Sequence, residues 1–569
     1  MTRMTSSEAF VETLVAHGID NSFGIVGSAY MDALDLFPAA GIRFLSVAHE
    51  QNAAHMADGF SRVTGRHGMC IAQNGPGVTN FVTAIAAAFW AHSPVVAITP
   101  EAGTMGQGQG GFQETEQLPI FEKITKYQVQ VNRIERIAEL THRALTLAMV
   151  ERGPVQVNIP RDLFYGEADY TIREPQYASL GAGAADELAK ATQLLAEARN
   201  PVIMAGGGVL MSTGTGELVA LAEHLQAPVI TAYLHNDAFP ASHPLYCGPI
   251  GYQGWKLAMN VVADADVVLC LGTRLGPFGT LPQHGLEYWP ANAKLIQVDS
   301  DHRTLGLTRD VAVAVNGDAR AAAVDLLERL RATTFQSSAT AAARLSDVGR
   351  LRAAWEAELN SWSSAGGTPV APRRALRELE QAMPADAMVA TDIGNICSVA
   401  NSYLRFDRPN SMLAPMMWGN CGYSFPTAMG AKVAAPERPA IAYVGDGAWG
   451  MSLTEMMTCV RENIGVVAVV FNNSMWGAEK RNQIDYYDSR FVGSDLHNPS
   501  FAAIARAMGG EGITVSSPGE IGDALRTAVT SGRPTVLEVM CTEELGDPFR
   551  RDALQHPVRL LDKYRHLNA

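Results

Sequence analysis

Gly445-Asp446-Gly447 follows the apolar run Ile441-Ala442-Tyr443-Val444, and Asn472-Asn473 follows the apolar run Val466-Val467-Ala468-Val469-Val470-Phe471. Short apolar runs bounded by turn residues predict buried strands of a parallel sheet. Because ligands of open α/β sheets bind beyond the carboxyl ends of such strands, we expect the aspartate and the asparagines to face one site. Carboxylate and carboxamide oxygens suit Mg²⁺, which commonly shares its coordination sphere with a phosphate. The glycines let backbone N–H groups approach that phosphate closely.

Strand-like runs of this kind alternate with helical patterns along the whole chain. At 569 residues the chain is too long for one ordinary hydrophobic core, and two to four domains are expected. We predict an α/β protein of three domains, each a mainly parallel sheet flanked by helices, with a Rossmann-like middle domain. The predicted domains are 1–185, 187–345 and 373–569. The other predicted strands include 68–72, 95–98, 155–159, 201–205, 267–271 and 295–298.

The charge balance is acidic, with a formal net charge of −14 and an isoelectric point near 5.5. Nucleic acids and anionic membranes attract basic patches, so neither is expected as a partner. No run reaches about 18 uninterrupted apolar residues, and no membrane span is predicted. Thr5 and Glu8 predict a capping box at the start of an amphipathic helix rather than a signal peptide, and we expect a cytoplasmic enzyme. The apolar side of that helix is expected to consist of Phe10, Val11, Leu14 and Val15.

The seven cysteines are scattered, odd in number and without CxxC spacing. Their mostly apolar surroundings favour buried free thiols over disulfides or zinc ligands. They are Cys70, Cys247, Cys270, Cys397, Cys421, Cys459 and Cys541.

Gly206-Gly207-Gly208 follows the predicted strand 201–205, where a dinucleotide could bind. The GxGxxG spacing is absent, because Leu210 and Met211 follow Val209. We interpret the glycines as a tight turn from a strand into a helix. A nucleotide-binding oxidoreductase that uses this middle block is an alternative, and it predicts a tightly bound flavin or nicotinamide.

Together, the Gly-Asp-Gly and Asn-Asn motifs, with a helix between them, resemble the thiamine diphosphate-binding motif of the thiamine-dependent enzymes. The resemblance implies the thiamine diphosphate-binding fold, with thiamine diphosphate and Mg²⁺ as cofactors. It implies that the metal ligands are Asp446, the side chain of Asn473 and the main-chain carbonyl of Met475. Residues implied to bind the diphosphate are Gly445, Gly447, Ala448 and, at another strand end, Asn395.

The N-terminal block contains the second signature of these enzymes, in the segment Ala48-His49-Glu50-Gln51-Asn52-Ala53-Ala54. By this resemblance Glu50 hydrogen-bonds N1′ of the cofactor's aminopyrimidine, whose 4′-imino group deprotonates the thiazolium. Taken alone, an acid at the start of a helix is more often solvated or a capping partner. Other residues implied to lie against the cofactor rings are Gly75, Asn80, Gly419 and Cys421.

A closer resemblance runs through all three blocks, to the sulfoacetaldehyde acetyltransferases within the acetolactate synthase-like superfamily. The segments that carry it are IAQNGPGVTNFVTA from residue 71, GQGGFQETEQ from 108, HNDAFPASHPL from 235, GTRLGPF from 272, NNSMWGAEKRN from 472 and GDPFRRDA from 546. This family converts sulfoacetaldehyde and phosphate to acetyl phosphate and sulfite, without a redox step or a required flavin. Its sites form between the first domain of one subunit and the third of another, so a homodimer or homotetramer is expected.

A sulfonate and a phosphate both need cationic partners, and an arginine pairs bidentately with tetrahedral oxyanions. The candidate substrate-binding cations are Lys480, Arg481, Arg550 and Arg551, although surface salt bridges would also account for them. Gln113 and His49 join Glu50 as candidate catalytic groups, and Gln113 is also a candidate substrate contact. An acetolactate synthase-like carboligase or a 2-oxo acid decarboxylase is the main alternative function.

Overall fold

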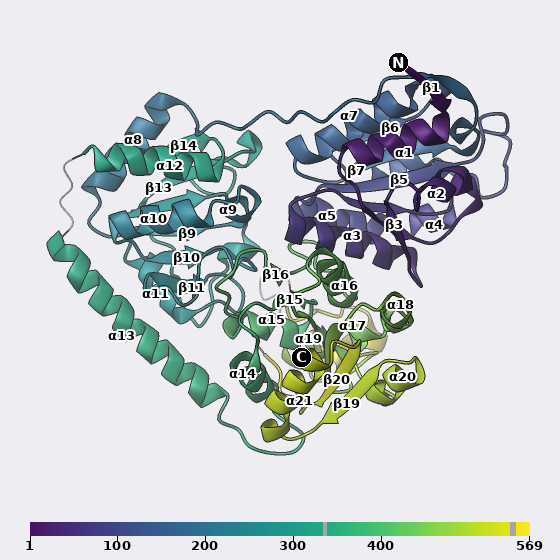
Figure 1. Ribbon diagram of the computed structural model, residues 1–569. Helices are drawn as coiled ribbons and strands as arrows, with labels where there is room; N and C mark the ends of the chain where they lie inside the picture. Colours follow the sequence, from purple (N-terminus) through teal and green to yellow (C-terminus); the bar gives the residue numbers. More distant parts are fainter. Residues whose placement is uncertain (334–337, 547–553, 569) are drawn as a thin grey trace.

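The computed structural model describes residues 1–333, 338–546 and 554–568. Three six-stranded sheets, one for each block of the sequence, form separate layers with helices on their faces (Figure 1). Every pair of neighbouring strands within these sheets is parallel, as the apolar runs predicted. Parallel sheets covered on both faces need nearly continuous apolar strands, which these sequences supply.

The N-terminal sheet has the order β3-β2-β4-β5-β7-β6. Its strands are β2 (Asn21–Gly24), β3 (Arg43–Ser46), β4 (Gly68–Ile71), β5 (Val95–Glu101), β6 (Tyr127–Gln130) and β7 (Val155–Pro160). Its helices are α1 (Ser6–Ala16), α2 (Met31–Leu36), α3 (Glu50–Thr64), α4 (Pro76–Thr79), α5 (Val82–Ala91), α6 (Gln117–Phe121) and α7 (Ile137–Val150). A short antiparallel pair, β1 (Thr2–Thr5) with β8 (Glu167–Tyr170), lies beside it.

The predicted N-terminal helix is α1, and its capping box between Thr5 and Glu8 is confirmed. Phe10, Val11 and Leu14 are buried, but Val15 is 39% exposed, so its place on the apolar side was predicted wrongly. A neighbouring residue is rotated by about 100° around a helix, and Val15 therefore lies at the edge of the face centred on Phe10 and Leu14.

The central sheet has the order β11-β10-β9-β12-β13-β14. Its strands are β9 (Pro201–Ala205), β10 (Val229–Thr231), β11 (Tyr246–Pro249), β12 (Val267–Leu271), β13 (Lys294–Asp299) and β14 (Val313–Asn316). Its helices are α8 (Ala185–Glu197), α9 (Gly207–Met211), α10 (Thr215–Leu225), α11 (Lys256–Ala263) and α12 (Ala319–Arg331). The long helix α13 (Ser338–Trp362) runs along the outside of the molecule towards the C-terminal sheet (Figure 1).

The C-terminal sheet has the order β16-β15-β17-β18-β20-β19. Its strands are β15 (Met388–Thr391), β16 (Met412–Leu413), β17 (Ala440–Gly445), β18 (Val466–Asn472), β19 (Glu511–Val515) and β20 (Thr535–Met540). Its helices are α14 (Pro372–Ala382), α15 (Asn395–Val399), α16 (Ser424–Ala434), α17 (Asp446–Trp449), α18 (Glu455–Glu462), α19 (Gly477–Tyr486), α20 (Phe501–Ala507) and α21 (Pro518–Ser531). None of the described helices is both long and apolar enough to cross a membrane.

The N-terminal and C-terminal domains share one hydrophobic core through α3 and α16. A Cβ atom on Gly59 of α3 would lie 2.1 Å from the carbonyl oxygen of Thr427, and one on Gly430 of α16 would lie 2.0 Å from that of Met56. Only glycine permits this approach of the two helix backbones. The helix that begins with Glu50 is therefore fixed against the domain that contains Asp446.

Candidate functional site

Asp446 and the Asn472–Asn473 pair lie at neighbouring strand ends, as the sequence predicted. Gly445, the last residue of β17, pairs with Phe471 of β18, so each strand delivers its polar residue to the same sheet edge. The Asp446 carboxylate accepts a 2.9 Å hydrogen bond from the N–H group of Gly447. Burial raises the pKa of Asp446, and hydrogen bonds from Gly447, Ser474, Asn498 and Met475 oppose that rise. A bound cation would stabilise the charged carboxylate that burial disfavours.

The side chains of Asn472 and Asn473 have different surroundings. Asn472 is buried, donates a 2.9 Å hydrogen bond to Glu538 and accepts one of 3.1 Å from Asn498. Asn473 is half-buried, and within the described residues its side chain has no hydrogen-bond partner. Its amide oxygen is thus available as a ligand, which fits the assignment of Asn473 rather than Asn472 to the metal.

Asn498 is a site residue that the sequence did not indicate. Its side-chain N–H₂ group donates to Asp446 at 2.8 Å and to Asn472 at 3.1 Å, which joins the two strand ends. It precedes Pro499 in a loop 52 positions beyond Asp446, and no local pattern connects them. An Asn-Pro turn ahead of α20 is the only sequence signal that marks it.

The turn after Asn473 positions the main chain of Met475. Ser474 has a φ of 55°, a left-handed conformation that reverses the chain direction. The carbonyl of Ser474 accepts from Leu496 and the N–H group of Trp476 donates to Ser494, both at 2.8 Å. Neither of these two hydrogen bonds uses the Met475 carbonyl. Carboxylate, carboxamide and carbonyl oxygens are the donor types that Mg²⁺ prefers, so these residues fit the implied ion.

The segment from Gly419 to Ser424 is held by Asp392, a second residue that the sequence argument did not assign. The buried Asp392 carboxylate accepts hydrogen bonds from the N–H groups of Gly422 at 3.1 Å and Ser424 at 2.9 Å. Burial raises its pKa to about 6. Cys421 is half-buried in this segment, and burial raises the pKa of its thiol to about 12, so it is a neutral thiol. The other six cysteines are buried free thiols, as predicted.

Glu50 and Asn80 are brought together in the N-terminal domain. Glu50 is the first residue of α3 and half-buried, and Oε2 of its carboxylate accepts a 2.9 Å hydrogen bond from the side chain of Asn80. Its Oε1 atom lies beside Gly77, where an added Cβ atom would be 3.2 Å away. A carboxylate fixed by one donor and left partly open can accept a second hydrogen bond from a ligand.

Gly75 and Gln113 form the other part of this N-terminal group. Gly75 has a φ of 67°, and an added Cβ atom would lie 2.5 Å from the main-chain oxygen of Gln113. The side chain of Gln113 accepts a 3.0 Å hydrogen bond from Gln73, and Asn74 donates to its carbonyl at 2.9 Å. His49 is the N-cap residue of α3, and its ring accepts from the N–H group of Gln51 at 3.2 Å.

The remaining predicted residues lie near the C-terminal group or outside the described chain. Asn395 begins α15, and its side chain accepts a 2.8 Å hydrogen bond from the N–H group of Gly546. Lys480 contacts Asp495 at 2.8 Å and Glu543 at 3.2 Å, and the bond to Asp495 raises its pKa. Arg481 pairs with Asp485 at 3.0 Å. Arg550 and Arg551 lie outside the described residues.

The predicted residues thus form two groups. The N-terminal group contains Glu50, Gly75, Asn80 and Gln113, and the C-terminal group contains Asn395, Gly419, Cys421, Gly445, Asp446, Gly447, Ala448, Asn473 and Met475. Within the described parts of the chain, no hydrogen bond or ion pair joins a member of one group to a member of the other.

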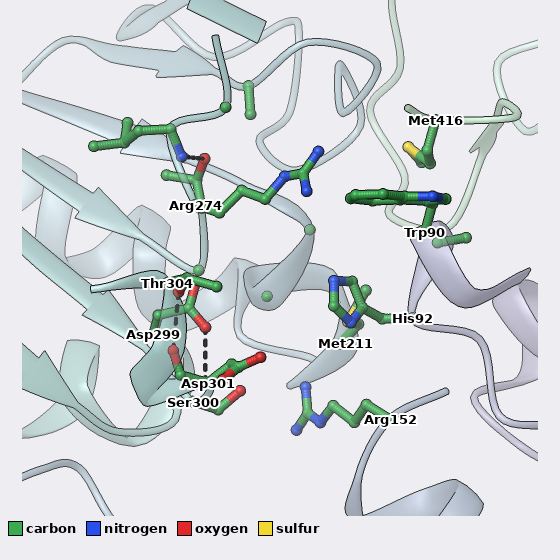
Figure 2. A pocket seen from close by; sticks show the side chains of 18 of the residues that line it. Trp90, His92, Arg152, Met211, Arg274, Asp299, Ser300, Asp301, Thr304 and Met416 are labelled. Atoms are coloured by element: carbon green, nitrogen blue, oxygen red, sulfur yellow. Dashed lines mark hydrogen bonds between the residues drawn. The ribbon is translucent and has the colours of Figure 1, made fainter. Parts of the chain in front are cut away.

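A cavity of about 550 Å³ lies elsewhere, between the N-terminal and central domains. Figure 2 shows Trp90, His92 and Arg152 facing Asp299 and Arg274 across it. The guanidinium group of Arg274 lies 4.6 Å from the centre of the Trp90 ring, a cation–π contact between the domains. None of the residues predicted to hold the cofactor lines this cavity.

Gly207 and Gly208 border the cavity, and the glycine run Gly206–Gly208 forms the expected tight turn between β9 and α9. An added Cβ atom on Gly208 would lie 2.6 Å from the Cα atom of Gly272, so the close packing of this turn on the end of β12 accounts for the glycine.

Comparisons with known proteins match each of the three blocks of the sequence to a domain of one enzyme family. Models of the thiamine pyrophosphate enzymes match at residues 4–120 for the N-terminal TPP binding domain, 188–327 for the central domain and 392–539 for the C-terminal TPP binding domain. The sulfoacetaldehyde acetyltransferase of Castellaniella defragrans is 58% identical, over 99% of this chain and 97% of the relative. That of Rhodobacter capsulatus is 45% identical, over 98% and 97%. A probable acetolactate synthase large subunit of Methanocaldococcus jannaschii is 32% identical, over 94% and 92%.

Proposed function

The chain belongs to the thiamine pyrophosphate enzymes and, within them, to the sulfoacetaldehyde acetyltransferase family, and we propose that it converts sulfoacetaldehyde and phosphate to acetyl phosphate and sulfite. The observation that carries the proposal is the 58% identity to a sulfoacetaldehyde acetyltransferase across nearly the whole of both chains. The acetolactate synthase alternative is less favoured, because the probable acetolactate synthase large subunit of Methanocaldococcus jannaschii is 32% identical. An oxidoreductase built on the middle block has no support from these relatives.

The protein is an acyltransferase with thiamine diphosphate as its cofactor. When bound, the cofactor would supply a nucleophilic carbon for the aldehyde and an electron sink for departure of the sulfonate group as sulfite. The role proposed for Glu50 is to hydrogen-bond the aminopyrimidine ring, with Asn80 fixing the orientation of its carboxylate. Gln113 is proposed to contact the substrate and, with His49, to orient its carbonyl or move a proton. Gly75 is proposed to lie against the cofactor.

The cofactor's diphosphate is proposed to bind through Mg²⁺. Asp446, the side chain of Asn473 and the carbonyl of Met475 are the proposed protein ligands of the ion. The short helix α17 begins at Asp446, so its first N–H groups lack the main-chain partners of a helix interior and can turn towards an anion, as that of Gly447 does towards the Asp446 carboxylate. Other proposed contacts of the cofactor are Asn395, Gly419, Cys421, Gly445, Gly447 and Ala448.

The substrates bring a sulfonate and a phosphate, and both need cations. Arg550 and Arg551 are proposed to bind them, because each can donate bidentately to an oxyanion. Lys480 and Arg481 stay candidates, but each would first have to leave a carboxylate partner.

We propose a homodimer as the minimum unit, with a homotetramer as the other possibility, because the N-terminal and C-terminal groups each present half of the expected site. The domain boundaries 1–185, 187–345 and 373–569 remain proposals, and the family matches fall inside them. A cytoplasmic location is likewise proposed.

The proposal is tested by incubating the purified protein with thiamine diphosphate, Mg²⁺, phosphate and sulfoacetaldehyde. We expect equal amounts of sulfite and acetyl phosphate, and no acetyl phosphate and at most one sulfite per active site when phosphate is omitted. Release of CO₂ from pyruvate without any release of sulfite from sulfoacetaldehyde would replace the proposal with the acetolactate synthase-like alternative.

A further inference from the structure

A buried glutamate of the C-terminal domain contacts the start of the helix that carries Glu50. Glu455 is the first residue of α18 and is completely buried. Its carboxylate accepts 3.1 Å hydrogen bonds from the main-chain N–H groups of Ala48 and His49. It also accepts from the side chain of Asn52 at 2.8 Å and from the hydroxyl of Thr458 at 2.6 Å. Three of its four donors thus belong to the turn and first helical residues around Glu50.

The position suits a carboxylate. The first N–H groups of a helix have no partner within the helix, and the positive end of the helix dipole favours a negative charge there. Hydrogen bonds to a charged acceptor are also stronger than those between neutral groups. Because Ala48 and His49 are the two residues before Glu50, these bonds fix the backbone from which the Glu50 side chain projects.

The rest of α18 is joined to the same region of the N-terminal domain. Arg43 of β3 donates to the carbonyl of Glu462 at 3.1 Å and pairs with its carboxylate at 3.2 Å. Arg461 donates to the carbonyl of Ser46, at the end of β3. These contacts lie nearer the surface, whereas Glu455 alone reaches the turn that leads into α3.

We propose that Glu455 is a positioning residue for Glu50. It holds the 48–52 turn so that the Glu50 carboxylate lies where the aminopyrimidine ring binds. The inference rests on the proposed function, because only a thiamine-dependent reaction gives Glu50 this role. It follows that the domain that carries Asp446 also sets the geometry of the acid that activates the cofactor. A displacement of about 1 Å in such a group reduces a rate by roughly a hundredfold.

The test is Glu455→Gln, which keeps the side-chain size but removes the charge and replaces one of the two acceptor oxygens with an N–H₂ group. In the cofactor-free protein, hydrogen–deuterium exchange of the 48–52 amides is measured by mass spectrometry. We expect it to become at least about tenfold faster, because these N–H groups lose a charged carboxylate acceptor and keep only a single neutral amide oxygen. In the loaded protein, C2–H exchange of the bound cofactor should slow by about ten- to a hundredfold while cofactor affinity changes by less than about threefold.

Glu462→Gln is the matched control. It removes another carboxylate of α18 that contacts the N-terminal domain, and both exchange rates should equal those of the wild type. If Glu455→Gln fails to fold, Asn52→Ala removes one donor of the same cluster and should change both rates in the same direction by less.

Wild-type protection of the 48–52 amides in Glu455→Gln, or unchanged C2–H exchange, would overturn the positioning role. So would a loss of cofactor affinity equal to the loss of exchange rate, since that indicates general damage to the site. If the wild-type protein neither binds thiamine diphosphate nor exchanges its C2 proton, the proposed function fails, and the cofactor-free amide exchange still reports whether Glu455 holds the turn.

Discussion

The side chain of Asn80 donates a 2.9 Å hydrogen bond to Oε2 of Glu50, and this bond joins the end of α4 to the start of α3. The two residues are 30 positions apart and meet because β4 returns the chain to the sheet edge beside β2. The bond leaves the other carboxylate oxygen of Glu50 beside Gly77, which has no side chain. Glu50 is therefore oriented and accessible in the same structure.

Glu50→Gln should reduce the rate of sulfite release by about 10²- to 10⁴-fold, the range typical of a lost acid–base group. A carboxamide cannot share a proton with the aminopyrimidine ring in the way that a carboxyl group does. Thermal unfolding and cofactor affinity should stay close to the wild type, because Gln can still accept the hydrogen bond from Asn80. Wild-type turnover in this variant would remove Glu50 from the mechanism.

Asn473→Ala and Asn472→Ala should have different consequences although the residues are adjacent. Asn473→Ala should raise the Mg²⁺ concentration needed for half-maximal cofactor binding and leave stability unchanged, since its side chain has no partner in the described chain. Asn472→Ala should lower the free energy of unfolding by about 1–3 kcal/mol, because the buried Glu538 loses a donor. Titration of Mg²⁺ and urea unfolding separate the two effects, and the opposite assignment would contradict the proposed ligand set.

The strands of the C-terminal site were predictable, and the residues that support them were not. β17 and β18 are uninterrupted apolar runs with polar residues at their ends, so their burial, direction and common edge followed from the sequence. Asn498, Asp392 and Glu455 are single polar residues whose long-range partners lie between 26 and 407 positions away. No periodicity or turn pattern in the sequence indicates which distant residue such a side chain contacts. Only the packing of α16 and α18 on the N-terminal domain brings Glu455 to its donors.

The histidine pair His17 and His142 should make stability depend on pH. The rings are joined by a 2.9 Å hydrogen bond, and burial, with the charges of His67 and His142, lowers the pKa of His17 to about 3. The unfolded chain binds a proton near pH 6.5, and the folded protein does not until the pH is much lower. The free energy of unfolding therefore falls as the pH drops from about 6.5 towards 3.

In the His17→Gln variant, the free energy of unfolding should fall less steeply as the pH decreases, by at most about 1.4 kcal/mol per pH unit. The reason is that the unfolded chain then takes up one proton fewer. Urea unfolding between pH 7.5 and pH 5.0, at several intermediate values, measures the slope. A variant with the same slope as the wild type would show that His17 is not held neutral by the fold.

Replacing both Arg550 and Arg551 with Gln should raise the KM for phosphate or for sulfoacetaldehyde at least about tenfold, since each lost charged hydrogen bond is worth about 1.5–3 kcal/mol. Cofactor affinity should be unchanged. Arg374→Gln, which removes an arginine paired with Glu378 on α14, serves as the control and should leave both KM values unchanged. Wild-type KM values in the double variant would return the anion-binding role to Lys480 or Arg481.

Subunit complementation tests most directly whether Glu50 of one chain and Asp446 of another hold the same cofactor. Glu50→Gln and Asp446→Ala chains are co-expressed with different affinity tags, and the mixed dimers are purified through both tags. Each variant alone should be inactive, and the mixed dimer should recover about half of the wild-type activity, because one of its two symmetric sites contains both intact residues. A mixed dimer as inactive as its parents would contradict the shared site.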